Sequence, residues 1–424
     1  MTAHEDITDG ATAPTLDDEA ILVAETQRNV RRASGAGWSR FTLPPFGTNL
    51  ESVYNHLATR GVDDAALQRP AEWFLDNYYI VRRVARQVAQ DLPPGFVRRL
   101  PRLATGPDEG LPRIDALTRE LIARKGIELD RSTLDSFVAA YQKIVPLSIA
   151  ELWALPTMLR ASVLRSLLSF FAELKVPGVG LQDVADSRAR RSDGNPPLNP
   201  SVGVECAIRE LRLLAEMDWQ VFFEEHSCVE TVLRSDPANV YARMDFDTCD
   251  DYRKAVEDLA WNTGITEEDV ASQAVLLARK ATHGPRRGHA GYYLVGEGRR
   301  VLEAQLGFRP KGLERVRRLV TRFPTFAYFL PLATLTAGPL LLVWWYAAQA
   351  SHAMWSPFSK VALVFACMLA VAPLWSLSAL VVQWVYAKLL PPRRLPKLDC
   401  VSYTHLRAHE TKANLVCRLL LEKK

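Results

Sequence analysis

The strongest candidate for metal chemistry in the sequence is a pair of aspartates, Asp245 and Asp247, separated by one phenylalanine. Carboxylate oxygens are the ligands that hard divalent cations prefer, so such a pair can hold a metal together with a diphosphate. Pairs of this kind follow a buried strand, whereas this one precedes Thr248, a residue type that favours helix N-termini. The pattern therefore favours a helix start at Thr248 over a metal site.

The other motifs that could carry chemistry are weaker. Gly296-Glu-Gly298 is too short for a dinucleotide fingerprint and predicts a turn. No nucleophile elbow, P-loop or HExxH zinc motif occurs before residue 400. His226, His283 and His289 are scattered, without a carboxylate or cysteine at ligand spacing. We therefore assign no catalytic, cofactor-binding or metal-binding residue.

One segment allows two interpretations. Arg286, Arg287 and His289 precede Tyr292-Tyr293, so they could bind a phosphate or a lipid headgroup. The same residues could equally form a solvated loop, which is the commoner fate of such a cluster.

Composition excludes several classes of protein. A formal net charge of +4 over 424 residues, with no basic run interleaved with aromatics, argues against nucleic-acid binding. The acidic, polar start lacks a secretory signal, and residues 1–48 are expected to be disordered. None of the six cysteines sits in a CxxC pair, so reduced thiols are expected rather than disulfides or zinc ligands.

Two apolar segments near the C-terminus, Phe326–Tyr346 and Val361–Tyr386, predict a transmembrane hairpin. About 20 apolar residues are what a helix needs to cross roughly 30 Å of hydrocarbon. Each contains proline, which membrane helices tolerate better than soluble ones. Tryptophans and tyrosines at the ends of the segments are typical of the two membrane interfaces.

Basic residues on the outer flanks predict the orientation of this hairpin. They are Arg315, Arg317, Arg318 and Arg322 before the first span, and Lys388, Arg393, Arg394 and Lys397 after the second. The connecting loop, 347–360, holds only His352 and Lys360. By the positive-inside rule both flanks are expected in the cytoplasm and the loop in the periplasm. The cluster Arg315–Arg322 could also contact anionic lipid, although signalling of topology explains it equally well.

The pattern over residues 49–308 is helical, with few alternating runs. Pro70 predicts the start of one helix, and Ser148 with Glu151 fits a capping box that opens a long helix, kinked near Pro156. The 3, 4, 7 spacing of one buried helical face is shared by Leu134, Phe137, Val138, Tyr141, Ile144 and Val145.

Further along, Ile208–Cys228 predicts one helix, bent near Asp218. Thr248–Trp261 and Thr266–Ala281 are each expected to begin on a threonine cap. The predicted fold class is therefore all-α, a helical cytoplasmic region followed by a two-helix transmembrane hairpin.

This pattern divides the chain into ten segments. They are a disordered N-terminus (1–48), a first helical block (49–175), a linker (176–200), a second helical block (201–310), a basic juxtamembrane segment (311–325), a transmembrane helix (326–346), a periplasmic loop (347–360), a second transmembrane helix (361–386), a cytoplasmic start of a further domain (387–400) and a C-terminal tail (401–424).

The tail, Val401–Lys424, resembles a translated sequencing adapter rather than natural protein. Its first part, VSYTHLRAHE, matches the codons of a transposon-library adapter, and LVCRLLL matches those of a flow-cell adapter after a short index. His405 and His409, four residues apart, are therefore not taken as metal ligands. Without the tail the net charge falls from +4 to about +1. We expect the natural protein to continue past about Asp399.

Several stretches resemble the N-terminal region of cyclic β-1,2-glucan synthases, large bacterial membrane enzymes. The matching stretches are Ala71–Leu103, Thr133–Arg160, Met244–Ala260, Gly288–Arg299 and Pro391–Asp399. The first, AEWFLDNYYIVRRVARQVAQDLPPGFVRRLPRL, and the motif GYYLVGEGR are the most specific. Together the stretches cover most of residues 70–399.

The resemblance implies an N-terminal membrane-anchoring part of an enzyme that transfers glucose from UDP-glucose with a divalent metal. In that family the glycosyltransferase follows the second span and a phosphorylase-like domain comes later, so this fragment is expected to be inactive and to hold no cofactor. Expected partners are the lipid bilayer of the bacterial inner membrane and those two missing domains, but no nucleic acid. The alternative is a non-catalytic, membrane-anchored helical interaction or regulatory module.

Overall fold

The computed structural model describes residues 15–31, 41–60, 65–177, 198–281, 286–310, 312–350 and 357–390. Within these ranges the chain forms 17 α-helices, one 3-10 helix and a single pair of two-residue strands. The prediction of an all-α fold is confirmed. His283, Trp355 and the tail 401–424 lie outside the described residues.

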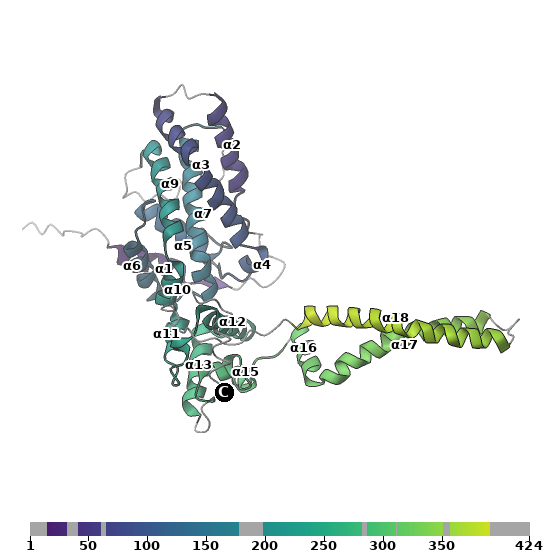
Figure 1. The fold of residues 1–424 in the computed structure, drawn as a ribbon. Helices are drawn as coiled ribbons and strands as arrows, with labels where there is room; N and C mark the ends of the chain where they lie inside the picture. The colour runs from purple at the N-terminus through teal and green to yellow at the C-terminus, as the bar shows by residue number, and fades with distance from the viewer. Residues whose placement is uncertain are drawn as a thin grey trace, which may run out of the picture. The chain divides into compact units, whose positions relative to one another are not determined.

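The elements follow one another along the chain in this order (Figure 1): α1 (Leu16–Thr26), β1 (Val30–Arg31), α2 (Phe46–Arg60), α3 (Ala65–Asp91), α4 (Pro94–Val97), β2 (Arg102–Leu103), α5 (Arg113–Lys125), α6 (Arg131–Gln142), α7 (Ile149–Glu173), α9 (Pro200–Glu216), α10 (Trp219–His226), α11 (Cys228–Arg234), the 3-10 helix η1 (Tyr241–Arg243), α12 (Phe246–Thr263), α13 (Glu267–Lys280), α14 (Ala290–Leu294), α15 (Arg299–Gln305), α16 (Leu313–Arg322), α17 (Pro324–Ala350) and α18 (Pro357–Leu389).

The chain forms two compact units, residues 1–242 with 250–302, and residues 243–249 with 303–424. The first unit is built on long helices, with α3, α7 and α9 packed on one another and α2 against α3 (Figure 1). A Cβ on Gly203 of α9 would lie only 2.5 Å from the ring of Phe170 in α7, so glycine lets these two helices approach closely. The predicted helical blocks on either side of the 176–200 linker therefore share one core. Residues 178–197 of that linker lie outside the described part.

Residues 16–26 differ from the disordered N-terminus predicted over 1–48, because they form α1. Thr15 accepts a hydrogen bond from the backbone of Asp18 and the Asp18 carboxylate accepts one from the backbone of Thr15. This capping box satisfies two N–H groups that the helix itself leaves free. Val23, 1% exposed, and its alanine neighbours are buried where α1 packs on α6. Periodicity missed this helix because it is short and its buried face, Ala20, Val23 and Ala24, has only one large apolar residue.

Two predicted helix starts are wrong. Helix α3 begins at Ala65, so Pro70 lies inside it. Helix α12 begins at Phe246, which places Thr248 within its first turn rather than at its cap, and Cys249 N donates to the carbonyl of Asp245. In α12 the helix begins earlier because the carbonyl of Asp245, another residue type that favours N-caps, accepts the first helical bond.

Other predicted boundaries are confirmed. Ser148 and Glu151 form the capping box of α7, which continues through Pro156 to Glu173. Thr266 caps α13 through the backbone of Asp269. The prediction of one helix over Ile208–Cys228 is wrong, because α9 ends at Glu216 and the Asp218 carboxylate caps a separate helix, α10. On α6 and the turn that follows it, the predicted buried face is confirmed except at Ile144, which is 36% exposed.

Candidate functional site

Helices α17 and α18 contain segments long and apolar enough to cross a membrane, Pro324–Tyr346 and Cys367–Leu389. They agree with the predicted spans, 326–346 and 361–386, apart from a shift of the second apolar segment toward its C-terminal end. Only 11% of each segment is buried within the protein, and Phe326 is 74% exposed. Apolar surface of this extent on two adjacent helices is what a lipid environment covers.

The two helices of the hairpin, α17 and α18, lie side by side (Figure 1). The rings of Tyr328 and Tyr386 meet edge to face, with centroids 5.9 Å apart. Four residues further along α17 and four back along α18 lie Leu332 and Val382, both buried. The next such step reaches the buried polar residues Thr336 and Ser378.

Small hydroxyl residues at this interface fit a membrane environment. The Thr336 hydroxyl donates to the carbonyl of Leu332, at 2.8 Å, so it is satisfied within its own helix. Ser378 is only 5% exposed and lets the helices come close. Contacts between membrane helices depend on such small residues because lipid tails give no hydrophobic drive for the helices to associate.

Helix α16 connects to the hairpin through its arginines. Arg317 donates to the carbonyl of Leu389 at 2.7 Å, which caps the negative C-terminal end of α18. Arg318 forms a bidentate pair with Glu303, at 2.7 and 2.8 Å, and a further bond to Glu314. Arg317 therefore ties α16 to the base of the hairpin, and Arg318 ties it to α15. Arg322 has its guanidinium over the ring of Phe323 and is exposed toward solvent or lipid.

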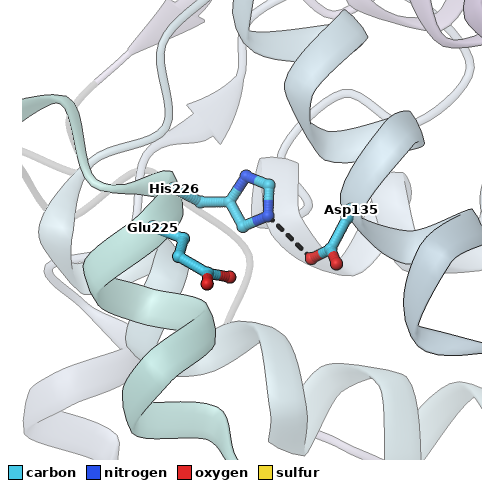
Figure 2. A group of neighbouring side chains, drawn as sticks. All are labelled: Asp135, Glu225 and His226. Carbon is cyan, nitrogen blue, oxygen red and sulfur yellow. Dashed lines mark hydrogen bonds and ion pairs between the residues drawn. The ribbon is translucent and has the colours of Figure 1, made fainter.

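Three side chains in the first unit, Asp135, Glu225 and His226, gather at metal-ligand distances from one another (Figure 2). This group was not predicted from the sequence, because Asp135 comes from α6 and the other two residues come from α10. His226 Nε2 lies 2.9 Å from Asp135 Oδ1. Arg131 donates to Asp135 at 2.8 Å and to Glu225 at 2.5 Å. A guanidinium already neutralises both carboxylates, so this cluster is an ion-pair network rather than a cation site.

His289 is held from both sides and does not form the phosphate site considered above. Its Nδ1 lies 2.7 Å from Asp236 Oδ2 and its Nε2 lies 3.2 Å from the hydroxyl of Tyr252. The other Asp236 oxygen accepts from the backbone of Ala290, and these bonds hold the pKa of Asp236 below its usual value despite burial, which acts in the opposite direction. A Cβ on Gly291 would clash with the Tyr252 ring, so the GYYL motif packs directly on this network.

The two remaining sequence motifs have structural places. Asp245 and Asp247 lie at the start of α12, so this pair marks a helix start as predicted, although the helix begins at Phe246 and not at Thr248. Gly296-Glu-Gly298 forms the turn between α14 and α15, as predicted. A Cβ on Gly298 would lie 2.5 Å from the Tyr292 ring, so this turn needs glycine there.

Glu210 of α9 is a buried carboxylate that was not predicted from the sequence. One oxygen accepts from Leu129 N at 3.2 Å, while Oε1 is buried without a hydrogen-bond partner among the described residues. Burial raises the pKa of Glu210 to about 7, and the neighbouring charges of Glu128 and Asp130 act in the same direction.

Because its folded pKa lies above the ordinary 4.5, Glu210 is expected to make the protein less stable as pH rises. Its protonated form is the better accommodated one, so stability falls between about pH 4.5 and 7 and is constant above that range. At pH 8 the free energy of unfolding of Glu210→Gln, measured with urea, should therefore exceed that of the parent by about 1–3 kcal/mol. At pH 4.5 the two free energies should be equal. Glu216→Gln, an exposed change on the same helix, should match the parent at both pH values. Equal stability of Glu210→Gln and the parent at pH 8 would contradict this assignment.

Together, a helical region and an apolar hairpin define the class of this chain as a helical protein with two membrane-capable helices. No protein-family profile matches it. The chain is similar to the cyclic β-(1,2)-glucan synthase NdvB of Rhizobium meliloti (strain 1021), with 26% identity over 361 residues that cover 69% of this chain. This similarity supports the relation to that enzyme predicted from the sequence. The matched part is 13% of the length of that protein.

Proposed function

We propose that this chain is the N-terminal membrane-anchoring part of a cyclic β-1,2-glucan synthase, an enzyme that transfers glucose from UDP-glucose. The observation that carries this proposal is the similarity to the Rhizobium meliloti enzyme over 69% of the chain. The apolar hairpin of α17 and α18 is the feature that such an anchor requires.

The proposed location is the bacterial inner membrane, with both flanks of the hairpin in the cytoplasm. Four arginines precede α17 within 315–322, and Lys388 with three further basic residues follows at the end of α18. The bond from Arg317 to the carbonyl of Leu389 holds α16 at the base of the hairpin. A transferase domain attached after α18 would then lie in the cytoplasm, where UDP-glucose is available. The donor and its divalent metal would bind to that domain.

Membrane fractionation and reporter fusions test the anchor. We expect the full chain to remain in bacterial membranes after alkaline carbonate extraction, and a variant lacking 324–389 to be released. Alkaline phosphatase fused at Met354 should be active, and the same fusion at Pro310 inactive, because only the connecting loop reaches the periplasm. Release of the full chain by carbonate would contradict the anchor. Phosphatase activity at Pro310 and not at Met354 would contradict the orientation.

The same preparation tests the assignment of catalysis to another domain. Purified in detergent, the chain should transfer no glucose from UDP-glucose, whereas the Rhizobium meliloti synthase assayed in parallel should do so. Measurable turnover by this chain would refute the proposed division between anchor and catalytic domain.

A further inference from the structure

A groove of about 650 Å³ lies on the outer face of α3, beside α2. Its lining is unusual because it combines three arginines with three tyrosines. The residues of this α3 groove are Tyr54, Leu75, Asp76, Tyr78, Tyr79, Arg82, Arg83, Arg86, Gln87 and Gln90. Its size is within the range of sites that bind nucleotide-sized molecules.

The three arginines come together because Arg82 and Arg86 are one helical turn apart and Arg83 adjoins them. None of the three guanidinium groups forms a hydrogen bond or ion pair with any residue that the structure describes. Some other arginines of the same unit are paired. Arg69 pairs with Glu205 at 3.1 Å and Arg99 with Glu257 at 3.3 Å.

Like charges one turn apart on a helix destabilise it, so this arrangement has a cost in the free chain. The acidic groups near the groove are few. Asp76 lies in its lining, and Glu51 is close enough to affect Tyr78. Burial raises the pKa of Tyr78 and Glu51 adds to the rise, while Arg82 and Arg86 oppose it. The two guanidinium groups are thus close to the phenol of Tyr78, which lines the groove.

The tyrosines give the groove an aromatic wall. The rings of Tyr54 and Tyr78 are stacked, with centroids 4.2 Å apart and planes at 21°. This pair bridges α2 and α3 and fixes the wall in place. Tyr79 is 66% exposed, so its ring face is open to a ligand. An aromatic face beside guanidinium groups suits a molecule with both a ring and a strong anion.

We propose that the α3 groove binds a phosphorylated small molecule of nucleotide size, with Arg82, Arg83 and Arg86 on the phosphate oxygens and Tyr79 against the ring. The planar guanidinium fork matches phosphate oxygens with two parallel hydrogen bonds, and one phosphate charge relieves the repulsion between the arginines. This site goes beyond the proposed anchoring function and does not depend on it.

Calorimetric titration of the full chain in neutral detergent, with ADP and with inorganic pyrophosphate, tests the proposal. We expect both to bind, and Arg82→Gln/Arg86→Gln to weaken both by at least about 10-fold. The matched control is Arg28→Gln/Arg98→Gln, which removes the same charge at two exposed arginines outside the groove and should leave affinity unchanged. Asp76→Asn should strengthen binding, a gain that damage to the fold does not produce.

Two further titrations test the stacking of a ring on Tyr79 and distinguish a soluble nucleotide from a lipid headgroup. Tyr79→Ala should weaken the binding of ADP by about 5-fold or more and leave the affinity for pyrophosphate unchanged, because only ADP has a ring to stack. Glycerol 3-phosphate, the headgroup fragment of anionic lipids, should bind more weakly than ADP if the natural ligand is a soluble nucleotide, and as tightly if it is a lipid headgroup. Absence of binding by every phosphate probe at millimolar concentration, or equal losses in the groove and control double variants, would overturn the proposal.

Discussion

Replacement of Glu151 by glutamine is expected to lower the free energy of unfolding by about 3–5 kcal/mol. Its carboxylate is fully buried and accepts two bonds from Arg113, at 2.7 and 2.5 Å, and two from Ser148. Burial alone would lower the pKa of Arg113, but the attraction of Glu151 more than reverses this effect. The variant would leave a buried guanidinium facing an amide that also donates. Urea unfolding of the full chain in mild detergent, followed by tryptophan fluorescence, measures the loss.

Two comparisons show whether the buried charge is the cause. Arg69→Gln breaks an ion pair in which Arg69 is 84% exposed, so it should cost less than about 1 kcal/mol. The double variant Arg113→Met/Glu151→Gln should lose less than Glu151→Gln alone, because no unpaired cation stays behind. A Glu151→Gln protein within 1 kcal/mol of the parent would show that Arg113 reaches water or another acceptor.

The second large effect is expected at Glu230, where glutamine should also cost about 3–5 kcal/mol. One oxygen of Glu230 accepts from Arg253 at 2.8 and 2.9 Å and from the Tyr241 hydroxyl at 2.8 Å. Arg253 is fully buried, with its guanidinium over the Phe223 ring at 4.9 Å. Loss of the carboxylate charge would leave this buried cation with the more distant Glu224, at 3.7 Å, as its acidic neighbour.

Arg234 supplies the matched control for this site, because it binds the other oxygen of Glu230 from the surface. Its side chain is 49% exposed, so Arg234→Gln should cost less than about 1 kcal/mol. Thermal unfolding in detergent should separate the two variants clearly. Equal losses in both would mean that the network acts as one exposed cluster rather than around a buried cation.

Local signals in the sequence were enough where neighbouring residues decide the structure. Ser148 with Glu151, and Thr266 with Asp269, lie three residues apart, and the bonds that such pairs form require no other part of the chain. Where the cap signal was weak, prediction failed. Thr248 competes with Phe246 for the start of α12, and backbone hydrogen bonding extends the helix to the earlier residue.

Contacts between distant segments were beyond prediction because they depend on packing. Glu151 was predicted only as a cap, and its buried partner Arg113 comes 38 residues earlier. Asp135 meets His226 across 91 residues, and its neutralisation by Arg131 decides that the group is an ion-pair network. Spacing along the chain contains no information about such meetings.

The sequence by itself determined the all-α class and the two membrane-capable segments, because helical periodicity and apolar length are local properties of the chain. It also indicated the relation to a cyclic glucan synthase through the stretch Ala71–Leu103. Only the tertiary structure decided which charges are buried and which are left without a partner. Burial depends on how helices pack. This packing covers Arg113, and it leaves Arg82 and Arg86 exposed beside the tyrosines of the α3 groove.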